Sequence, residues 1–313
     1  YRAYRRLKSA LNAQPVDILH SHSEFSDMAV IFLKLEGKAP LLAHTVHNEL
    51  RVIWGRRPLR RLLFTQFLDP LLFDMELGVS QYIKGNLDGR WMAERLGRHA
   101  LAVPNALDIH RFQRTTAVRQ QIRQELGIPQ DAFVVGSVGR LSEQKGYDVL
   151  IDAAASALKL APELHILLVG EGPLAPVLKQ QASDLGIAQQ VTFTGQRTDV
   201  ERMLQAMDLF ACSSRWEGLS TVLMESMASG VPIVATDVPG NRELLRAGEN
   251  AWLVRVEDGA ALADALLIAR HNPAQGQIYA RQAQVDVQAF GIEAVAARHE
   301  QLYCDLVKRH HAS

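Results

Sequence analysis

The stretch FVVGSVGRLSEQKGY, from Phe133 to Tyr147, decides the fold of this chain. It begins with an apolar, β-rich run, passes through a loop that contains Gly139 and Gly146, and leads into a helical pattern. Apolar runs and helical stretches continue to alternate as far as Val254. Strands that are apolar throughout are expected where helices cover both faces of a parallel sheet. The sequence therefore predicts a doubly wound α/β domain.

The predicted strands of this domain are short apolar runs that end near Gly or Ser, at 133–138, 165–169, 191–194, 209–211, 233–235 and 252–254. The predicted helices between them include 147–159, 174–185, 200–207 and 221–229. The part of the chain before Pro104 follows the same pattern less completely, with strands expected at 17–19, 41–46, 76–79 and 100–103. We therefore expect a second Rossmann-like domain there.

The length of 313 residues also favours two domains, because it exceeds what one hydrophobic core usually supports. The polar stretch 104–130 is interpreted as the connection between them. We expect an acceptor-side domain at 1–104, a nucleotide-sugar donor domain at 105–290 and a C-terminal helix at 291–313 that braces the two. Tyr1 lies within a helical pattern, so we expect the first domain to be N-terminally truncated.

The composition narrows the class of protein. The formal net charge is zero, 48% of the residues are hydrophobic and 22% are charged, which is typical of a soluble globular protein and argues against a nucleic-acid binder. Cys212 and Cys304 form no CxxC pair, which fits a reducing compartment. The sequence contains no apolar run long enough for a membrane span and no recognisable signal peptide. We expect a cytoplasmic protein.

Two cations stand in the loop that follows the first strand of the second domain. Arg140 and Lys145 lie between Gly139 and Gly146. In open α/β sheets ligands bind at the carboxyl ends of the strands, and glycines let the backbone approach a bulky anion closely. The loop is therefore predicted to bind a diphosphate. A solvated loop with two surface charges is the alternative that this segment alone leaves open.

A second loop, from Ser213 into the helix that contains Glu225, again follows a predicted strand directly. The amides from Leu219 to Val222 at the helix start would bind a phosphate through their partial positive charge. Glu217 and Glu225, separated by seven residues, would accept hydrogen bonds from a sugar and from a ribose. Glu225 has apolar neighbours, among which an unpaired carboxylate is costly, so we favour a functional role over an ordinary surface position.

Together these motifs resemble family 4 of the glycosyltransferases, a large group of retaining enzymes with the two-domain GT-B fold. The resemblance covers nearly the whole chain and is most specific in its second half. It rests on motifs in the order and spacing of that family, namely Gly139-Arg140-Leu141 with Lys145-Gly146, then 170–173, 191–195, and Glu217 with Glu225. The resemblance implies a GT-B-like α/β fold, in which two Rossmann-like doubly wound parallel-sheet domains face a cleft.

The same resemblance implies roles for individual residues. Arg140 and Lys145 would bind the donor diphosphate and stabilise the leaving charge, Glu217 would contact the transferred sugar, and Glu225 would bind the ribose. The predicted catalytic residues are His47, Arg140, Lys145 and Glu217. The predicted donor site comprises Gly139, Arg140, Lys145, Glu171, Arg197, Glu217, Gly218, Leu219, Ser220, Thr221 and Glu225. The resemblance implies no metal and no cofactor.

Histidines mark the first domain. Residues 17–22 and 45–48 resemble the family's acceptor-side strand ends, where a histidine lies beside the reacting sugar. His47 is the candidate for that position, and His20 and His22 are weaker ones. A histidine that is hydrogen-bonded at a strand end is the alternative reading of His47. With His44 these residues could suggest zinc, but no cysteine or carboxylate at ligand spacing completes a site.

The predicted function is hexosyl transfer from a UDP- or GDP-sugar to a glycan or lipid-linked acceptor, in cell-surface polysaccharide, lipopolysaccharide or glycolipid synthesis. Two alternatives stay open, a nucleotide-sugar 2-epimerase and a catalytically silent nucleotide-binding partner subunit. An oxidoreductase is disfavoured. Residues 170–175 fit a dinucleotide fingerprint by letter, but the next strand ends at 194–197 without the acidic residue that binds a cofactor ribose.

Residues 51–64 interleave arginines with Trp, Leu and Phe. Such a segment can lie on an anionic membrane surface, which would suit a lipid-linked acceptor at the inner face of the membrane. A helix that packs by its apolar side and exposes its basic side is an equal alternative. We therefore expect peripheral membrane contact through this segment as a hypothesis.

Overall fold

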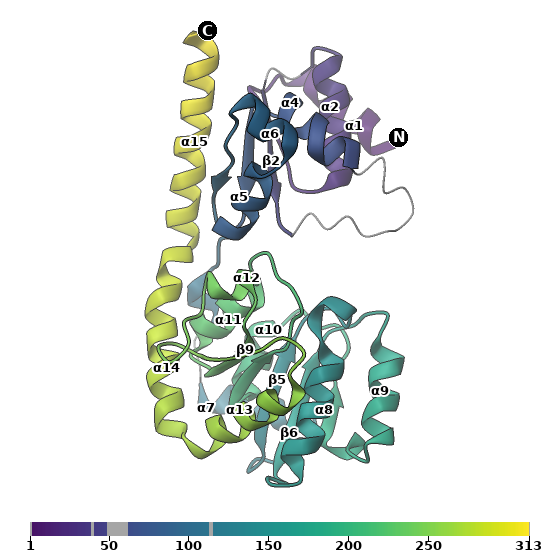
Figure 1. Cartoon of the computed structure of the whole chain (residues 1–313), viewed down its shortest axis with the longest axis vertical. Coiled ribbons are helices and arrows are strands. Elements are labelled where there is room, and N and C mark those ends of the chain that lie inside the picture. The colour runs from purple at the N-terminus through teal and green to yellow at the C-terminus, as the bar shows by residue number, and fades with distance from the viewer. Residues whose placement is uncertain (1, 39–40, 49–61, 113–114, 313) are drawn as a thin grey trace. The chain divides into compact units, whose positions relative to one another are not determined.

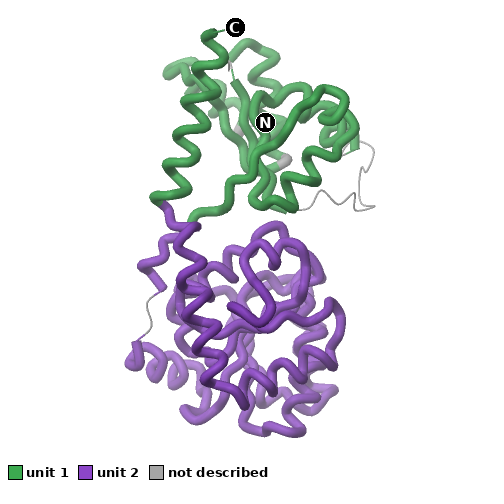
Figure 2. Tube along the Cα trace, turned by 60° about the vertical axis from the view of Figure 1, so that its left-hand side comes forward, with its two compact units in different colours: residues 1–106, 293–313 green, residues 107–292 purple. Residues whose placement is uncertain are grey.

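The computed structural model describes residues 2–38, 41–48, 62–112 and 115–312. The chain divides into two compact units (Figure 2). Unit 1 comprises residues 1–106 and 293–313, and unit 2 comprises residues 107–292. Each unit has a parallel sheet of its own with helices packed against it (Figure 1).

The sheet of unit 2 has six parallel strands in the order β10-β9-β8-β5-β6-β7. They are β5 (Phe133–Val138), β6 (Leu164–Val169), β7 (Val191–Phe193), β8 (Leu209–Cys212), β9 (Ile233–Thr236) and β10 (Trp252–Val254). The chain runs outward from β5 in one direction and then returns to continue outward from β8 in the other. The two central strands, β5 and β8, therefore form the point at which the strand order reverses.

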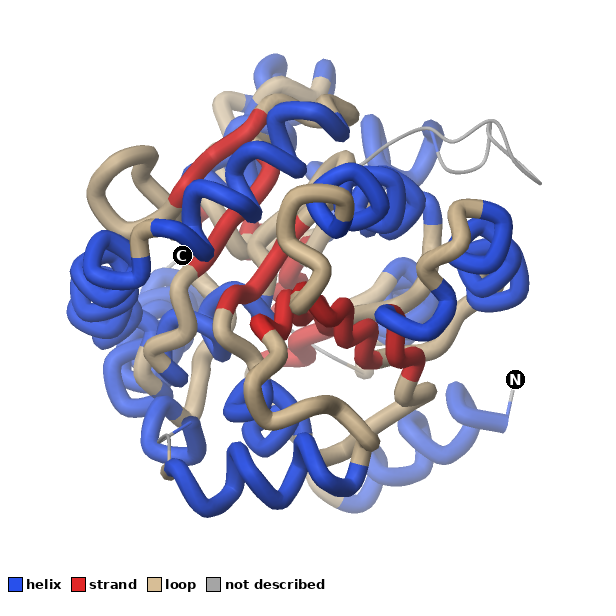
Figure 3. The backbone as a smooth tube through the Cα atoms, turned by 90° about the horizontal axis from the view of Figure 1, so that it is seen from below, coloured by secondary structure: helices blue, strands red, loops and turns tan. Residues whose placement is uncertain are grey.

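The apolar strands of unit 2 are buried because helices cover the sheet on both faces (Figure 3). Side chains of α8, α9 and α13 form one continuous core with the strands. The helices of unit 2 are α7 (Thr116–Glu125), α8 (Tyr147–Leu158), α9 (Ala175–Asp184), α10 (Val200–Ala206), α11 (Thr221–Ser229), α12 (Pro239–Arg242), α13 (Gly259–His271) and α14 (Pro273–Asp286), with 3-10 turns η2 (Ile109–Phe112), η3 (Glu143–Lys145), η4 (Ala188–Gln190) and η5 (Val287–Phe290).

The stretch 104–130 is more than the polar connection that its sequence indicates, because it contains α7, which packs on α10. Ile122 of α7 is fully buried, and so is Arg123. Arg123 Nη2 donates to Asp208 Oδ2 at 2.6 Å, and its other nitrogens bind backbone carbonyls. A buried arginine whose donors are satisfied in this way behaves as a core residue. The polar composition of residues 104–130 gives no indication of this.

The sheet of unit 1 has four parallel strands in the order β1-β2-β3-β4. They are β1 (Ile18–Ser21), β2 (Leu41–Val46), β3 (Met75–Gly78) and β4 (Leu101–Ala102). One face packs against Val295, Leu302 and Leu306 of α15 (Ile292–Ala312), the predicted C-terminal helix. The other face packs against α2 (Glu24–Leu35) through Val30 and Ile31.

The remaining helices of unit 1 are α1 (Arg2–Ala13), η1 (Phe64–Leu68), α4 (Asp69–Leu72), α5 (Gln81–Asp88) and α6 (Trp91–Leu96). Both units are thus parallel-sheet α/β structures, as the sequence predicts. In the described part of the chain, no helix is both long enough and apolar enough to cross a membrane.

Candidate functional site

The two loops predicted to carry the chemistry meet where the strand order of unit 2 reverses. Residues 139–146 follow β5, and residues 213–220 follow β8, its neighbour in the sheet. In open α/β sheets the crevice at this point is the usual ligand site, because the loops on its two sides diverge. Gly146, with φ of 59°, allows the loops to touch, because a Cβ there would lie 2.2 Å from the Ser213 carbonyl oxygen.

Lys145 and Glu217 form an ion pair between the two loops. Lys145 Nζ lies 2.6 Å from Glu217 Oε1, and Ser214 Oγ donates to the same oxygen at 2.6 Å. The Glu217 side chain is 5% exposed and the Lys145 side chain 19% exposed, so solvent screens the pair only weakly. Burial by itself would lower the pKa of Lys145, but the Glu217 carboxylate outweighs this effect and raises it. Lys145 is therefore a cation at neutral pH.

Close backbone packing holds Glu217 from its other side. A Cβ at Gly240, in α12, would lie 2.3 Å from the Glu217 carbonyl oxygen, so any larger residue there would push against the loop. Gln144 Nε2 donates to the Trp216 carbonyl at 3.1 Å. The carboxylate therefore sits on a backbone that is fixed by its neighbours.

A pocket of about 940 Å³ opens along the carboxyl ends of β5, β6 and β7. Residues 138–141, at the start of the Lys145 loop, line it, whereas Lys145, Glu217 and the start of α11 do not. Its lining includes Gly139, Arg140, Glu171 and Arg197 of the predicted donor site. Arg140 and Glu171 are exposed, so they are accessible to a ligand. A pocket of this volume is large enough for a nucleotide.

Arg197 lines the pocket but is bound to acidic partners in its own unit. Its Nε donates to Asp199 Oδ1 at 2.8 Å, and its Nη2 donates to Glu125 Oε1 at 2.9 Å. These hydrogen bonds, first with Asp199 and then with Glu125, raise the already high pKa of Arg197 further. Its place in the donor site stays a prediction, with the guanidinium shared between the pocket wall and these carboxylates.

The start of α11 supplies amide donors beside Glu217. Ser220 caps the helix and Thr221 begins it, while Gly218 and Leu219 lie buried immediately before. The first amides of a helix lack intrahelical acceptors and carry partial positive charge, so they attract anions. Within the part of the chain that the structure describes, the buried Ser220 Oγ also has no hydrogen-bond partner. These donors and the Lys145 ammonium suit a diphosphate.

Glu225 lies one to two turns further along α11 and is partly buried. Burial raises its pKa to about 7, with nearby Glu201 raising it further and Arg111 opposing the shift. Arg111 Nη2 also pairs with Glu201 Oε2 at 3.3 Å. Glu225 is thus a carboxylate of unusually high proton affinity on the helix that begins beside Glu217.

In unit 1 the predicted histidine His47 follows β2 and lies next to His22. Their nitrogens, His22 Nδ1 and His47 Nε2, are 3.3 Å apart. Burial and the neighbouring His22 lower the pKa of His47, so it is uncharged at neutral pH. His20 stacks on His22, and its ring nitrogens bond Thr45 Oγ1 at 2.8 Å and the Tyr303 hydroxyl. Burial lowers the pKa of His20 to about 4, so it is uncharged at neutral pH.

His44, the fourth histidine near these strands, lies in a different environment. It is 1% exposed, and its Nε2 is 2.8 Å from Glu76 Oε1. Arg90 Nη2 donates to the other oxygen of Glu76 at 2.5 Å. Despite its burial, the pKa of His44 is raised to about 9 by Asp27 and Glu76. This is a buried charge network in the core of unit 1. Among the described residues, no group of three or more potential ligands could hold a metal ion.

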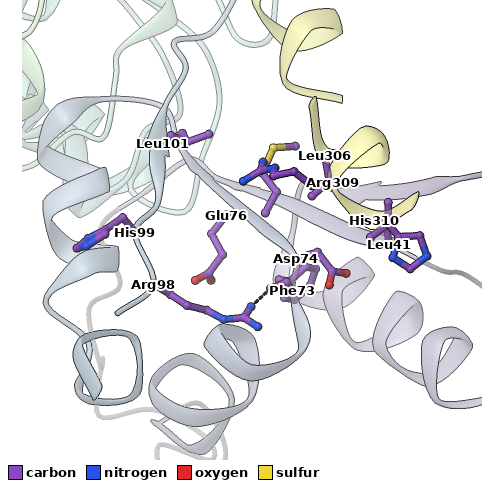
Figure 4. Close-up of a pocket in the computed structure, with 11 residues that line it drawn as sticks. Leu41, Phe73, Asp74, Glu76, Arg98, His99, Leu101, Leu306, Arg309 and His310 are labelled. Carbon is purple, nitrogen blue, oxygen red and sulfur yellow. Dashed lines mark hydrogen bonds between the residues drawn. The ribbon is translucent and has the colours of Figure 1, made fainter. Parts of the chain in front are cut away.

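Unit 1 also contains a cavity of about 390 Å³ at the amino ends of β2, β3 and β4 (Figure 4). Its two carboxylates already have partners. Asp74 Oδ2 accepts from Lys34 Nζ at 2.5 Å and from the Leu42 amide at 2.8 Å, and Glu76 belongs to the network described above. Arg98 on its wall donates to the Phe73 carbonyl at 2.5 Å. This cavity contains none of the predicted site residues.

The basic segment predicted to contact a membrane falls mostly outside the described residues. Residues 49–61 are not described, so that part of the hypothesis has no structural account. Leu62 and Leu63, which are described, are 39% and 48% exposed. They are exposed apolar residues at the end of the segment 51–64.

Comparison with known proteins decides the family. The sequence model of the glycosyl transferases group 1 family matches residues 118–285, which are most of unit 2 and include both loops. The chain belongs to this family. The lipopolysaccharide core biosynthesis mannosyltransferase LpsB of Rhizobium meliloti is 33% identical over 260 residues, which cover 77% of this chain and 72% of that protein.

A second similar sequence and a similar solved structure agree with this assignment. The phosphatidyl-myo-inositol mannosyltransferase of Mycobacterium tuberculosis is 29% identical over 308 residues, covering 96% of this chain and 76% of that protein. Among solved structures, Anabaena Alr3699/HepE in complex with UDP and glucose matches with a TM-score of 0.87 at 23% identity, covering 96% of this chain and 81% of that chain. The predicted family 4 resemblance and GT-B fold are confirmed, and the chain is a glycosyltransferase.

Sequence reasoning missed several residues that shape this site. Ser214 and Gln144 bind Glu217 or its loop, and Arg215 bridges to the other loop. Arg111 reaches Glu225 from η2. A polar residue next to a recognised motif is a usable signal for Ser214 and Arg215, whereas no sequence signal connects residue 111 to residue 225.

Proposed function

We propose that this glycosyltransferase moves a hexose from a UDP- or GDP-sugar to a glycan or lipid-linked acceptor with retention of the anomeric configuration. The observation that carries the proposal is the Lys145–Glu217 ion pair beside the start of α11, at the point where the strand order reverses. It combines a cation, amide donors and a carboxylate within one loop pair. A nucleotide-diphosphate sugar needs all three.

In this proposal Lys145, Arg140 and the α11 amides bind the diphosphate. When the bond between the sugar and the diphosphate breaks, negative charge grows on the leaving oxygen. Fixed positive charge placed there stabilises the transition state more than the ground state. Lys145 has three donors, so it can keep Glu217 as a partner while it binds a phosphate oxygen.

Glu217 is proposed to accept hydrogen bonds from the transferred sugar. Its Oε1 already receives hydrogen bonds from Lys145 and Ser214, which orients the carboxylate and reduces its strength as a nucleophile. This favours a sugar-binding role over a covalent one. The leaving phosphate would then help to deprotonate the acceptor on the same face of the sugar.

Glu225 is proposed to bind the ribose hydroxyls. A carboxylate accepts both hydroxyls of a ribose, and the partly buried setting strengthens such bonds. No metal is part of the proposal. Glu171, Arg197 and Gly139 would line the rest of the nucleotide site, in the pocket that runs past β6 and β7.

Unit 1 is proposed to bind the acceptor, with His47 beside the reacting sugar. The expected domains, 1–104, 105–290 and 291–313, are proposed as acceptor domain, donor domain and bracing helix. The relatives named for lipopolysaccharide core and phosphatidyl-myo-inositol support a role in cell-surface polysaccharide or glycolipid synthesis. We propose that the enzyme works in the cytoplasm at the inner face of the membrane, with contact through residues 51–64.

Calorimetry tests the donor site directly. We would titrate UDP-, GDP- and ADP-sugars into the protein and its Lys145→Ala and Glu225→Ala variants without metal. Each substitution is expected to weaken one donor by roughly tenfold or more, since a charge-assisted hydrogen bond contributes about 1.5–3 kcal/mol. Lys159→Ala, an exposed lysine at the end of α8, is the control and should bind normally. Tight binding unchanged by both site substitutions would refute the proposal.

A further inference from the structure

Arg215 lies two residues before Glu217 but points away from the pocket, toward the other loop. Its Nη1 and Nη2 donate to the two carboxylate oxygens of Asp148, at 3.0 and 2.7 Å. Nη1 also donates to the Glu143 carbonyl at 2.9 Å. Asp148 and Glu143 lie on either side of Lys145. The guanidinium of the Glu217 loop therefore binds both flanks of the Lys145 loop.

The backbones of the two loops are joined at the same place. The Arg215 amide donates to the Gln144 carbonyl at 2.8 Å, and Ser213 Oγ donates to the Lys145 carbonyl at 2.8 Å. The Arg215 side chain adds further contacts between the two loops, to Asp148 and to the Glu143 carbonyl. Because a planar guanidinium presents its donors as a rigid fork, it fixes direction as well as distance.

A third loop joins this cluster. Glu257, between β10 and α13, accepts from Arg215 Nε at 2.6 Å. Among the described residues, it is the one non-glycine residue with a positive φ, 61°. The Glu257 side chain is 61% exposed, so this ion pair is the weaker of the two that Arg215 makes with a carboxylate, and the bidentate pair with Asp148 carries most of the link between the loops.

We propose that Arg215 is a positioning residue for glycosyl transfer: by binding Asp148, the Glu143 carbonyl and Glu257, it holds Lys145 and Glu217 in register at the donor site. The inference rests on the proposed roles of those two residues. The Arg215 guanidinium is engaged by Asp148, the Glu143 carbonyl and Glu257, so we place its action on Lys145 and Glu217 rather than on the donor.

This role predicts a particular kinetic pattern. A small error in the position of Lys145 against Glu217 would cost more in the transition state than in nucleotide binding, which also uses the α11 amides and Glu225. Arg215→Lys keeps the charge but loses the fork. We expect kcat to fall by about tenfold to a hundredfold, while the dissociation constant of the nucleoside diphosphate changes by less than about threefold.

Arg119→Lys is the matched control. Arg119 has a similarly exposed side chain, 27% against 18%. It binds one carboxylate, Asp208, and two backbone carbonyls, where Arg215 binds two carboxylates and one carbonyl. These contacts involve Asp208, which precedes β8 at the opposite edge of the sheet. If Arg215 were merely structural, both variants would lose thermal stability and activity to a similar extent. A selective loss of kcat in Arg215→Lys would separate the two roles.

A second measurement does not depend on turnover. The pH dependence of Lys145 acetylation by acetic anhydride, followed by mass spectrometry, reports the pKa of Lys145. Glu217 raises that pKa, so an Arg215→Lys variant in which the pair has loosened should show a lower value, and Arg119→Lys should not. If the unaltered protein binds no nucleotide sugar, the proposed function fails. The acetylation measurement still tests whether Arg215 holds Lys145 against Glu217. An unchanged kcat together with an unchanged Lys145 pKa would overturn the inference.

Discussion

In unit 2, Lys145 and Glu217 pair at the carboxyl edge of the sheet where the strand order reverses, whereas in unit 1, Arg90 and Glu76 pair inside the core with His44. Arg90 is 2% exposed, and its three nitrogens donate to Glu76 and to the Leu87 and Thr65 carbonyls, so burial keeps it from a ligand. The Lys145 ammonium has three N–H donors, one of which binds Glu217 Oε1, and its side chain is 19% exposed. A pair at a sheet edge can exchange partners with a substrate, and a pair in the core can only hold the fold.

The largest effect is expected from breaking the core pair. Arg90→Met would leave the Glu76 carboxylate buried without its cation, which should lower the free energy of unfolding by about 3–5 kcal/mol. Urea unfolding measures this. Arg95→Met, which removes an exposed arginine lying over the Trp91 ring, should cost no more than about 1 kcal/mol. Equal stability of the two variants would mean that the core network contributes nothing.

Breaking the edge pair should have the opposite signature. Lys145→Ala is expected to lower kcat by about 10²–10³-fold, the typical effect of removing one donor that stabilises a developing anion. The free energy of unfolding should fall less than in Arg90→Met, because Glu217 keeps the Ser214 hydroxyl and the Lys145 side chain is 19% exposed where that of Arg90 is 2% exposed. Steady-state transfer and urea unfolding on the same preparation compare the two quantities. Loss of stability with intact kcat would place this pair with the core one.

His47→Gln sharpens the comparison within unit 1. If His47 contacts the reacting sugar, losing its hydrogen bond should lower transfer by about tenfold, or 1.4 kcal/mol, without changing nucleotide affinity. His20→Gln is the comparison variant, because His20 is bound to Thr45 and Tyr303. His20→Gln should lower the free energy of unfolding more than it lowers the rate of transfer. Identical behaviour of the two variants would leave His47 as a structural histidine.

The smallest expected effect is a pH dependence of nucleotide binding. Burial raises the pKa of Glu225 to about 7, and the ionised form is the better acceptor for ribose hydroxyls. The ionised fraction, and with it the affinity, should rise about threefold between about pH 6.5 and pH 7.5. Binding should also release protons, which calorimetry in two buffers detects. Glu225→Gln should remove the dependence, and a dependence that survives this substitution would have another source.

Much of unit 2 could be predicted from the sequence because its signals are local. The apolar run at 133–138 and the glycine loop after it identify β5 and its ligand edge without knowledge of the partners. The sequence predicts Lys145 and Glu217 only as two residues of one site. Their direct pairing depends on β5 lying next to β8, which is a property of strand order.

The buried charge network of unit 1 could not be predicted from the sequence. His44 and Glu76 are opposite each other across β2 and β3, and that register places an ionisable pair in a buried sheet. The sequence shows only a histidine among other histidines and a glutamate in an apolar run. Arg90 completes the network from the start of α6, and nothing in its sequence neighbourhood indicates burial. Long-range pairing of polar residues is decided by topology.

The central claim is that the donor diphosphate binds between Lys145 and the start of α11. A crystal structure of the protein with the nucleotide sugar selected by calorimetry tests it most directly. The account predicts diphosphate oxygens within hydrogen-bond distance of Lys145 Nζ and of the amides at Thr221 and Val222, with the sugar against Glu217. A diphosphate bound elsewhere, with the Lys145–Glu217 pair unaltered and out of reach, would contradict it.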